Sequence, residues 1–370
     1  MPEIYSQASI KQDLHNYLID DNCQKLKKRI NFNKDLYIAT ALKEKVFLPL
    51  VEKMHDDGII NKSENNLYRE FQKRSEEFRI ICNGLRNKDI AFGILKGESF
   101  SPYLLGRSRD SWDLDLFITD VNQVSEMLIF LKNYGYEQNQ PVMVRKLKTT
   151  SLSFSISMKK KSELLKNFGN YRIEIHCKNV PIDEYCTYNT KGLRFDEYSI
   201  MSHHSLEKIF LLEFLSRKKK KQDSVRVRDF LDIKYFWCGL PETREYACEM
   251  GILRLFNIIS KIKNGELNIC DISILDAQIE KEYESFLLRS LGIANANIIK
   301  VYYIRCIIYA CEWLELNRAS WFTNYINKVI SRLSSNLGFY NYVSEEKSFT
   351  ELLATDASKL QVSRRPSYTW

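Results

Sequence analysis

The chain has 370 residues, of which 44% are hydrophobic and 28% charged, and its net charge is +8. These values favour a globular protein with room for two or three packed units, and they exclude an intrinsically disordered chain. Only 13 glycines and 7 prolines are present, which favours long helices with short connections. No apolar run approaches the roughly 20 residues of a membrane span, so we expect no membrane partner.

The N-terminus and the cysteines indicate a cytoplasmic protein. The first residues read MPEIYSQASIKQDLHNYLIDD, which lacks the basic-then-apolar order of a signal peptide. Nine cysteines are scattered without C-x-x-C pairs, and an odd number cannot all pair within one chain. We therefore expect reduced thiols, a cytoplasmic location and no zinc site.

The first 90 residues have the pattern of helices. Within 66–85, Leu67, Phe71, Phe78 and Ile81 recur near the helical period, with charged residues between them. This stretch predicts one long amphipathic helix.

Beyond residue 91 the pattern changes from helix to strand. The run AFGILKG is short and apolar and ends in glycine, as a buried strand does. The next run, SWDLDLFITD, alternates: Leu114 and Leu116 share one face of a predicted strand, and Asp113 and Asp115 share the other.

One helix and two further β-rich stretches are predicted next. Residues 121–134 have an amphipathic helical pattern that a glycine closes. The β-rich stretches lie around 141–158 and at 171–178, and in the second Glu174 and His176 share a face opposite apolar residues. His176 could hydrogen-bond Glu174 as a structural histidine.

The order of these patterns predicts an α+β fold with three regions. We expect an N-terminal helical region at 1–90, a small mixed-sheet core at 91–200 and a C-terminal helical domain at 201–370.

Three acidic residues are the first candidates for chemistry. A period-two strand projects Asp113 and Asp115 from one surface, where their mutual repulsion requires a positive partner. Oxygen ligands without a neighbouring cysteine or histidine favour Mg²⁺ or Mn²⁺ over zinc. With Glu174 as a third carboxylate, the sequence predicts a two-metal site for phosphoryl transfer. A D-x-D motif alone is also common on the polar face of a half-exposed strand.

A turn suited to phosphate precedes the acidic pair. Gly97 ends the first predicted strand and lets backbone N–H groups approach a phosphate without a Cβ in the way. Ser99 could add a hydroxyl donor. Glu98 places a carboxylate beside the same turn, which would repel a triphosphate unless it points away.

These motifs resemble a bacterial family of polymerase-β-like nucleotidyltransferases. The resemblance rests on Leu95-Lys96-Gly97, Arg107 or Arg109, Asp113-Leu114-Asp115-Leu116, Gly135-Tyr136 and Glu174-Ile175-His176. It implies a nucleotidyltransferase core in which Mg²⁺ or Mn²⁺ is held by Asp113, Asp115 and Glu174. It also implies that a nucleoside triphosphate is bound by Lys96, Gly97, Ser99 and Arg109.

Two later segments are similar to motifs of abortive-infection nucleotidyltransferase toxins. The segments are SLEKIFLLEFLSR and RVRDFLDI, and the matching residues are Lys208, Arg226, Arg228, Asp229 and Asp232. The similarity implies that Lys208 stabilises charge on the nucleotide phosphates, that Arg228 also binds them, and that Asp229 orients Lys208 or the base. Arg228 and Asp232 are also spaced i,i+4 and could simply pair with each other.

The resemblance covers about residues 91–237 and implies transfer of a nucleoside monophosphate to an acceptor hydroxyl or phosphate. The acceptor could be RNA such as tRNA, a small molecule or a protein side chain. The sequence also leaves open whether a partner protein regulates the activity. The alternative is a non-catalytic nucleotide- or RNA-binding protein that retains the fold, which Glu98 favours.

A basic block fits RNA as one of these acceptors. Seven of the twelve residues at 217–228 are lysine or arginine, and such a block attracts phosphates, nucleic acid or anionic lipid. A solvated loop between helices is the other interpretation.

Overall fold

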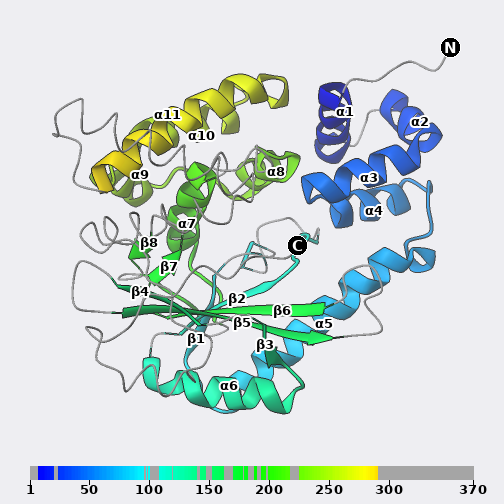
Figure 1. The fold of residues 1–370 in the computed structure, drawn as a ribbon. Helices are drawn as coiled ribbons and strands as arrows, with labels where there is room; N and C mark the ends of the chain where they lie inside the picture. The colour runs from blue at the N-terminus through cyan, green and yellow to red at the C-terminus, as the bar shows by residue number, and fades with distance from the viewer. Residues whose placement is uncertain are drawn as a thin grey trace, which may run out of the picture. The chain divides into compact units, whose positions relative to one another are not determined.

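The fold is seen in a computed structural model of the chain (Figure 1). The structure describes residues 7–20, 24–95, 97, 99–100, 108–118, 120–139, 142–146, 152–161, 170–177, 179–181, 187–189, 193–196, 199–216 and 225–290.

Helices occupy the N-terminal part of the described chain. They are α1 (Gln7–Ile19), α2 (Gln24–Phe32), α3 (Lys34–Glu44), α4 (Phe47–Asp56), the 3₁₀ turn η1 (Lys62–Glu64) and α5 (Asn66–Arg86). The long helix α5 begins where Asn65 accepts a hydrogen bond from the backbone N–H of Tyr68, a capping contact that satisfies an unpaired donor of the first turn. Phe71, Phe78 and Ile81 of α5 are buried, as their spacing predicts.

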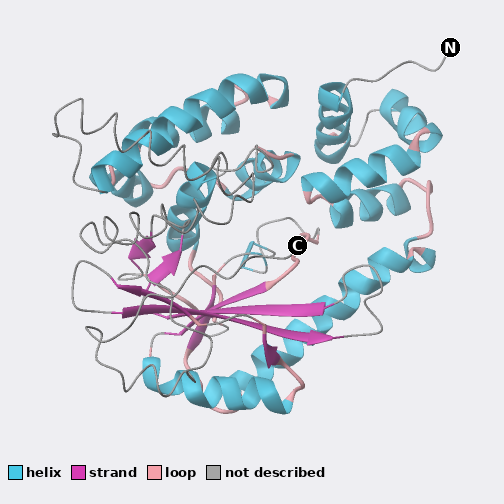
Figure 2. Ribbon diagram, in the orientation of Figure 1, coloured by secondary structure: helices cyan, strands magenta, loops and turns pink. Residues whose placement is uncertain are grey.

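The strands lie in the middle of the described chain and form a main sheet and a hairpin (Figure 2). The strands are β1 (Phe92–Ile94), β2 (Leu114–Ile118), β3 (Glu137–Gln138), β4 (Met143–Lys146), β5 (Leu152–Lys161), β6 (Asn170–Cys177), β7 (Asn179–Pro181) and β8 (Thr187–Asn189). The main sheet has the order β1-β2-β6-β5-β3, and β4 also pairs with β5. Both β3 and β4 run antiparallel to β5.

Helices return after the strands. They are α7 (His203–Ser216), α8 (Val227–Phe236), α9 (Pro241–Glu249), α10 (Leu253–Lys263), the 3₁₀ turn η4 (Ile269–Asp271) and α11 (Ile272–Ser290). Pro241 opens α9 at a position where its missing N–H costs no helical hydrogen bond.

The chain divides into two compact units that do not follow sequence order. Unit 1 comprises residues 1–116, 161–172 and 192–283, and unit 2 comprises 117–160, 173–191 and 284–370. Strands β2 and β6 each contribute residues to both units.

Unit 1 joins the N-terminal helices to the helices that follow the strands. Within it α1 packs against α3 and α8, and α8 packs against α10. An aromatic cluster fills its core: the ring of Phe236 lies edge-on to Phe100 and Phe210, and Trp237 packs on Phe256. Gly93 of β1 lies directly against the ring of Phe195, with which a Cβ at this residue would clash.

Unit 2 holds α6 (Val124–Asn133), preceded by the 3₁₀ turn η3 (Val121–Gln123), together with most of β5. Val124, Met127 and Leu131 form the buried face of α6. Tyr134 is the C-cap of α6, and Gly135 adopts a left-handed backbone conformation with φ of 82°.

The structure confirms the predicted α+β class. Within the described residues, helices precede and follow the strands, and the predicted helix at 121–134 is present as η3 and α6. The nucleotidyltransferase identity of the sheet stays a prediction. Among the described helices, none combines the length and apolar character that crossing a membrane requires.

Candidate active site

Strands β1 and β2 bring the predicted glycine turn next to the acidic pair. The two strands are neighbours in the sheet, and the backbone N–H of Leu95 donates to the carbonyl of Asp115 at 3.0 Å. Asp113 is half-buried and Asp115 is buried. The turn after β1 and the D-x-D motif therefore meet, although sixteen residues separate Gly97 from Asp113.

The turn itself packs tightly against the segment that leads into β2. Gly97 has φ of +46°, and a Cβ on it would lie 2.5 Å from the hydroxyl oxygen of Ser111 and 3.9 Å from Nη1 of Arg109. Only glycine fits here. Ser99 is fully buried, and its hydroxyl donates to the carbonyl of Ile94, so this hydroxyl ties the turn to β1. Lys96 and Glu98 lie outside the described residues.

A buried arginine lies beside the acidic pair. Arg74 of α5 is 1% exposed, donates to the carbonyl of Ser111 at 3.0 Å and lies over the ring of Trp112. Burial lowers the pKa of Arg74 to about 10, while the Asp113 carboxylate opposes that shift. Arg74 therefore remains charged at neutral pH and supplies part of the positive charge that Asp113 needs.

Glu174 and His176 lie on β6, the neighbour of β2 in the sheet. Within unit 2, a carboxylate oxygen of Glu174 lies 3.8 Å from Nε2 of His176. His176 is 1% exposed, and its Nδ1 lies 2.8 Å from the hydroxyl of Ser155. A second hydrogen bond of this kind commonly orients a metal-bound histidine. A carboxylate and an imidazole together suit Mn²⁺ at least as well as Mg²⁺, which prefers oxygen ligands.

Arg109 and Arg228 share one buried carboxylate. Arg109 donates to both oxygens of Asp232, with Nη2 at 2.8 Å and Nε at 3.3 Å, and its guanidinium lies 4.2 Å from the centre of the Phe100 ring. The Nε of Arg228 lies 4.0 Å from the same carboxylate, which confirms the i,i+4 pairing considered for Arg228 and Asp232.

Lys208 lies against α9. Its ammonium is 5.3 Å from the centre of the Tyr246 ring. Partial burial lowers the pKa of Lys208, and the acidic side chains Glu249 and Glu242 of α9 oppose that shift. These contacts give Lys208 a structural role in packing α7 against α9. That it stabilises charge on nucleotide phosphates stays a prediction.

Asp229 caps the helix that carries it. The residue is fully buried, and its carboxylate accepts the backbone N–H of Arg226 at 2.9 Å, as part of a capping box at the start of α8. Asp229 therefore fixes the first turn of α8, and its predicted role in orienting Lys208 stays a prediction.

Asp110 caps a helix to which it does not itself belong. The two oxygens of its buried carboxylate accept the backbone N–H groups of Phe47 and Leu48, at 2.7 and 2.8 Å, at the N-terminus of α4. Burial raises the pKa of Asp110 to about 6, and these hydrogen bonds oppose the shift.

Asp110 should give the protein a measurable pH dependence of stability. Its pKa is raised in the folded state, so the folded protein keeps a proton that the unfolded chain loses, and stability falls as pH rises from about 4 to about 6. We expect wild type to gain about 1 kcal/mol relative to Asp110→Asn when pH falls from 7 to 5. Urea unfolding of both proteins at the two pH values measures this difference. Equal changes in both would contradict it.

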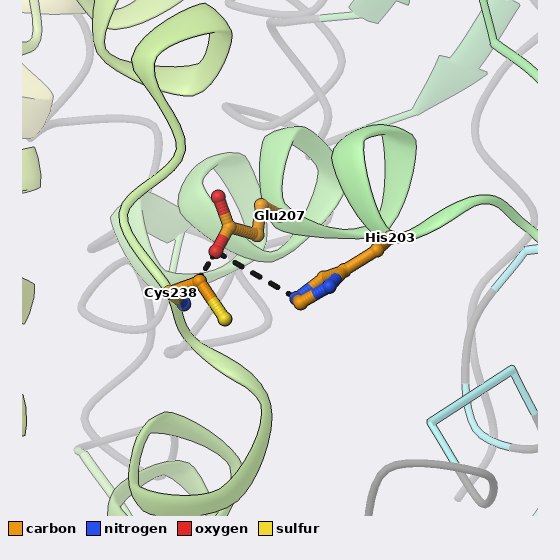
Figure 3. A group of neighbouring side chains, drawn as sticks. All are labelled: His203, Glu207 and Cys238. Atoms are coloured by element: carbon orange, nitrogen blue, oxygen red, sulfur yellow. Dashed lines mark hydrogen bonds and ion pairs between the residues drawn. The ribbon is translucent and has the colours of Figure 1, made fainter.

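A second group of potential metal ligands lies where α7 meets the connection between α8 and α9. His203, Glu207 and Cys238 each offer a ligand atom within 4.8 Å of the others (Figure 3). The hydrogen bonds of these side chains indicate a structural role instead. Glu207 is fully buried and accepts the backbone N–H groups of Cys238, Gly239 and Leu240.

The remaining contacts of this group also belong to the helix ends. Glu207 accepts a fourth hydrogen bond, from the hydroxyl of Thr243 at 2.8 Å, and Nε2 of His203 lies 2.7 Å from the carbonyl of Phe236. The carboxylate thus serves the N-terminus of α9 and the imidazole serves the C-terminus of α8. A metal would have to displace both sets of hydrogen bonds, so the group fits helix capping better than metal binding.

The basic block is mostly outside the described residues, which resume at Val225. Of its two described members, Arg226 is half-buried at the N-cap of α8 and Arg228 is 8% exposed beside Asp232. The buried position of Arg228 leaves it little surface to offer an RNA backbone.

Sequence reasoning missed several buried charged residues. Arg74 lies between Phe71 and Phe78 on the apolar stripe of α5, and Glu207 precedes Phe210 and Phe214 at the same helical spacing. The signal in the sequence was a charged residue at an otherwise apolar position of the helix. Such a residue predicts a buried charge with a specific partner, because burying an unpaired charge is costly.

Comparisons with models of known protein families, with curated proteins and with solved structures found no match for this chain.

Proposed function

We propose that this chain is a metal-dependent nucleotidyltransferase. It would transfer a nucleoside monophosphate from a nucleoside triphosphate to an acceptor hydroxyl or phosphate. In this reaction a bond forms between the acceptor oxygen and the α-phosphorus, the bond from the α-phosphorus to the bridging oxygen breaks, and pyrophosphate leaves.

The observation that carries the proposal is the meeting of the glycine turn with the D-x-D strand. The backbone hydrogen bond from Leu95 to Asp115 aligns β1 with β2, and Gly97 approaches Ser111, two residues before Asp113. A turn suited to phosphate and a metal-binding carboxylate pair are the two parts that nucleotidyl transfer requires at one place.

The side chains have distinct roles in this proposal. Asp113, Asp115 and Glu174 would hold the metal, as the family resemblance implies. A bound divalent cation would neutralise the triphosphate and polarise the acceptor. Arg74 would hold Asp113 in place through its charge and its hydrogen bond to the carbonyl of Ser111.

The proposal is tested with each α-labelled nucleoside triphosphate, in the presence of Mn²⁺ or Mg²⁺, with tRNA and with cell extract as acceptor sources. We expect label transfer with pyrophosphate release in wild type and a loss of at least about a hundredfold in Asp115→Asn. Asp120→Asn is the matched control, because Asp120 is an exposed carboxylate shortly after β2, and it should keep full activity.

Metal binding provides a readout that needs no acceptor. Electron paramagnetic resonance of Mn²⁺ with each nucleotide should show a bound complex in wild type and in Asp120→Asn, and a weakened one in Asp115→Asn. Wild type that binds no Mn²⁺–nucleotide at millimolar concentration would contradict the proposal.

Two observations favour the non-catalytic alternative. Arg74 already supplies positive charge near Asp113, and the hydroxyl of Ser99 is used within the turn. A protein that retained the fold for nucleotide or RNA binding would bind labelled nucleotide without releasing pyrophosphate from any acceptor source. The same two measurements therefore separate the two functions.

A further inference from the structure

The helices α2 and α3 of unit 1 carry an aromatic ring that is almost completely open to solvent (Figure 1). The ring belongs to Phe32, the last residue of α2. Its side chain is 88% exposed, more than any other large hydrophobic residue in the part of the chain that the structure describes. A single exposed apolar side chain is common on protein surfaces, so the residues around the ring decide what it can bind.

Lysines surround this ring. Lys25, Lys28 and Phe32 recur at spacings of three and four residues, which places them on one face of α2. Lys34 begins α3 two residues after the ring. All three lysines are exposed, and among the described residues none of them forms an ion pair. We call Lys25, Lys28, Phe32 and Lys34 the α2–α3 surface. Asp35 is the only acidic residue between 24 and 36, so this surface keeps a net positive charge.

The other two cations of α2 are used by the fold itself. Lys27 forms an ion pair with Asp57, which follows α4, and Arg29 forms one with Asp13 of α1. These pairs join α2 to its neighbouring helices. The lysines of the α2–α3 surface have no such role, so their charge is available to a partner outside the chain.

The apolar residues of α2 argue against a membrane as that partner. Leu26 and Ile30, the other large apolar residues of this helix, are buried in the protein. A helix that lies in a membrane surface needs a continuous apolar face toward the lipid. Here only Phe32 and Leu36 are exposed, and Leu36 is 43% exposed. Self-association is also disfavoured, because two copies of the α2–α3 surface would bring like charges together.

We propose that the α2–α3 surface binds single-stranded nucleic acid. Phosphates would pair with Lys25, Lys28 and Lys34, and an unpaired base would stack on the ring of Phe32. Lysines beside an exposed aromatic ring are the combination that binds single strands with little sequence preference, because every base has a face that can stack. None of the residues assigned to the metal or the nucleotide belongs to this surface. Binding therefore requires no metal and does not rest on nucleotidyl transfer.

The first experiment measures binding to the full chain in EDTA by fluorescence anisotropy. The probe is a labelled oligouridylate of about 12 nucleotides, a length that spans a typical single-strand site. Sedimentation with phosphatidylserine vesicles tests the membrane as partner. We expect the single strand to bind with an affinity that falls as salt rises, and the vesicles to bind weakly or not at all. No binding of the single strand, with or without binding of vesicles, would overturn the proposal.

Substitutions of Phe32 test base stacking. Phe32→Ala removes the ring, so we expect affinity for the single strand to fall about tenfold, while affinity for an RNA duplex, whose bases are already stacked, stays unchanged. Phe32→Leu keeps an apolar side chain without an aromatic face and should lose as much, whereas Phe32→Trp should bind at least as well as wild type. The Tm of all three variants should equal that of wild type, because the side chain packs on so little of the protein. Wild-type affinity in Phe32→Ala or in Phe32→Leu would overturn the proposal.

Substitutions of the lysines test the phosphate contacts. Lys25→Ala combined with Lys28→Ala should make the plot of log affinity against log salt less steep by about 1.4, because each phosphate contact to a single strand contributes about 0.7 to that slope. Lys73→Ala combined with Lys88→Ala is the matched control, since both lysines are exposed and lie outside the α2–α3 surface. Equal slopes in the two double variants would overturn the proposal. Asp115→Asn should leave this binding intact even where it abolishes nucleotide binding, so the two proposals fail separately.

Discussion

Replacing Asp232 by alanine is expected to destabilise the protein by about 3–5 kcal/mol. The substitution leaves Arg109 without the carboxylate that accepts two of its hydrogen bonds, in a position where only 5% of the arginine side chain is exposed. The cost comes mainly from the unpaired buried guanidinium, since the favourable Coulomb energy of the pair is largely offset by its own desolvation. Urea unfolding followed by circular dichroism measures the loss.

A double variant separates these two contributions. Arg109→Met combined with Asp232→Leu removes both charges and retains most of the side-chain volume, so it should recover most of the stability that Asp232→Ala loses. Asp56→Ala is the control, because Asp56 is an exposed residue of α4 and its loss should cost less than about 0.5 kcal/mol. A double variant as unstable as Asp232→Ala would show that the arginine is not the source of the cost.

The second large effect is expected for Glu207→Gln. The carboxylate of Glu207 accepts four hydrogen bonds, three of them from backbone N–H groups that open α9. An amide keeps one acceptor oxygen and turns an N–H₂ group toward a donor, so at least one N–H loses its partner. We expect a loss of about 3 kcal/mol, because hydrogen bonds to a buried charge are among the strongest in proteins. Thermal and urea unfolding measure it.

Glu245→Gln is the matched control for this effect. Glu245 is exposed on α9, the helix that Glu207 caps, so the same chemical change there should shift stability by less than about 0.5 kcal/mol. A loss in Glu207→Gln no larger than in Glu245→Gln would mean that the cap contributes little to the fold.

Periodic patterns predicted the elements that have a clear apolar face. The helices α5 and α6 and the strands β2 and β6 all appear where the spacing of apolar residues places them. The short strands β3, β7 and β8 were not predicted, because two or three residues are too few for a period to show.

The partners of buried charges could not be predicted from one sequence. Pattern analysis assigns charged residues to solvent, so Arg74 and Glu207 were overlooked. The pairing of Arg109 with Asp232 joins residues 123 positions apart. The spacing of residues along the chain cannot predict a contact over such a distance in sequence. The candidate site was easier to predict, because Gly97, Asp113 and Asp115 lie in or next to β1 and β2, which are neighbours in the sheet and close in sequence.

The roles given to Lys208 and Asp229 show the same limit. Both residues were placed near a nucleotide by motif similarity, and the structure shows that each has a sufficient structural role: Lys208 beside the acidic face of α9 and Asp229 in the cap of α8. Residue type and spacing fit both uses, so only functional measurements can distinguish them.

Some helix ends are capped by side chains that lie far away in the sequence. This limits which pieces of the chain can be expected to fold alone. The backbone N–H of Val227, at the start of α8, donates to the carboxylate of Glu44 at 3.0 Å, and α1 packs on the same helix. A truncated chain that begins near residue 91 retains every motif of the nucleotidyltransferase resemblance, yet it lacks Glu44 and α1. We therefore expect that a piece of the chain able to fold alone includes the N-terminal helices.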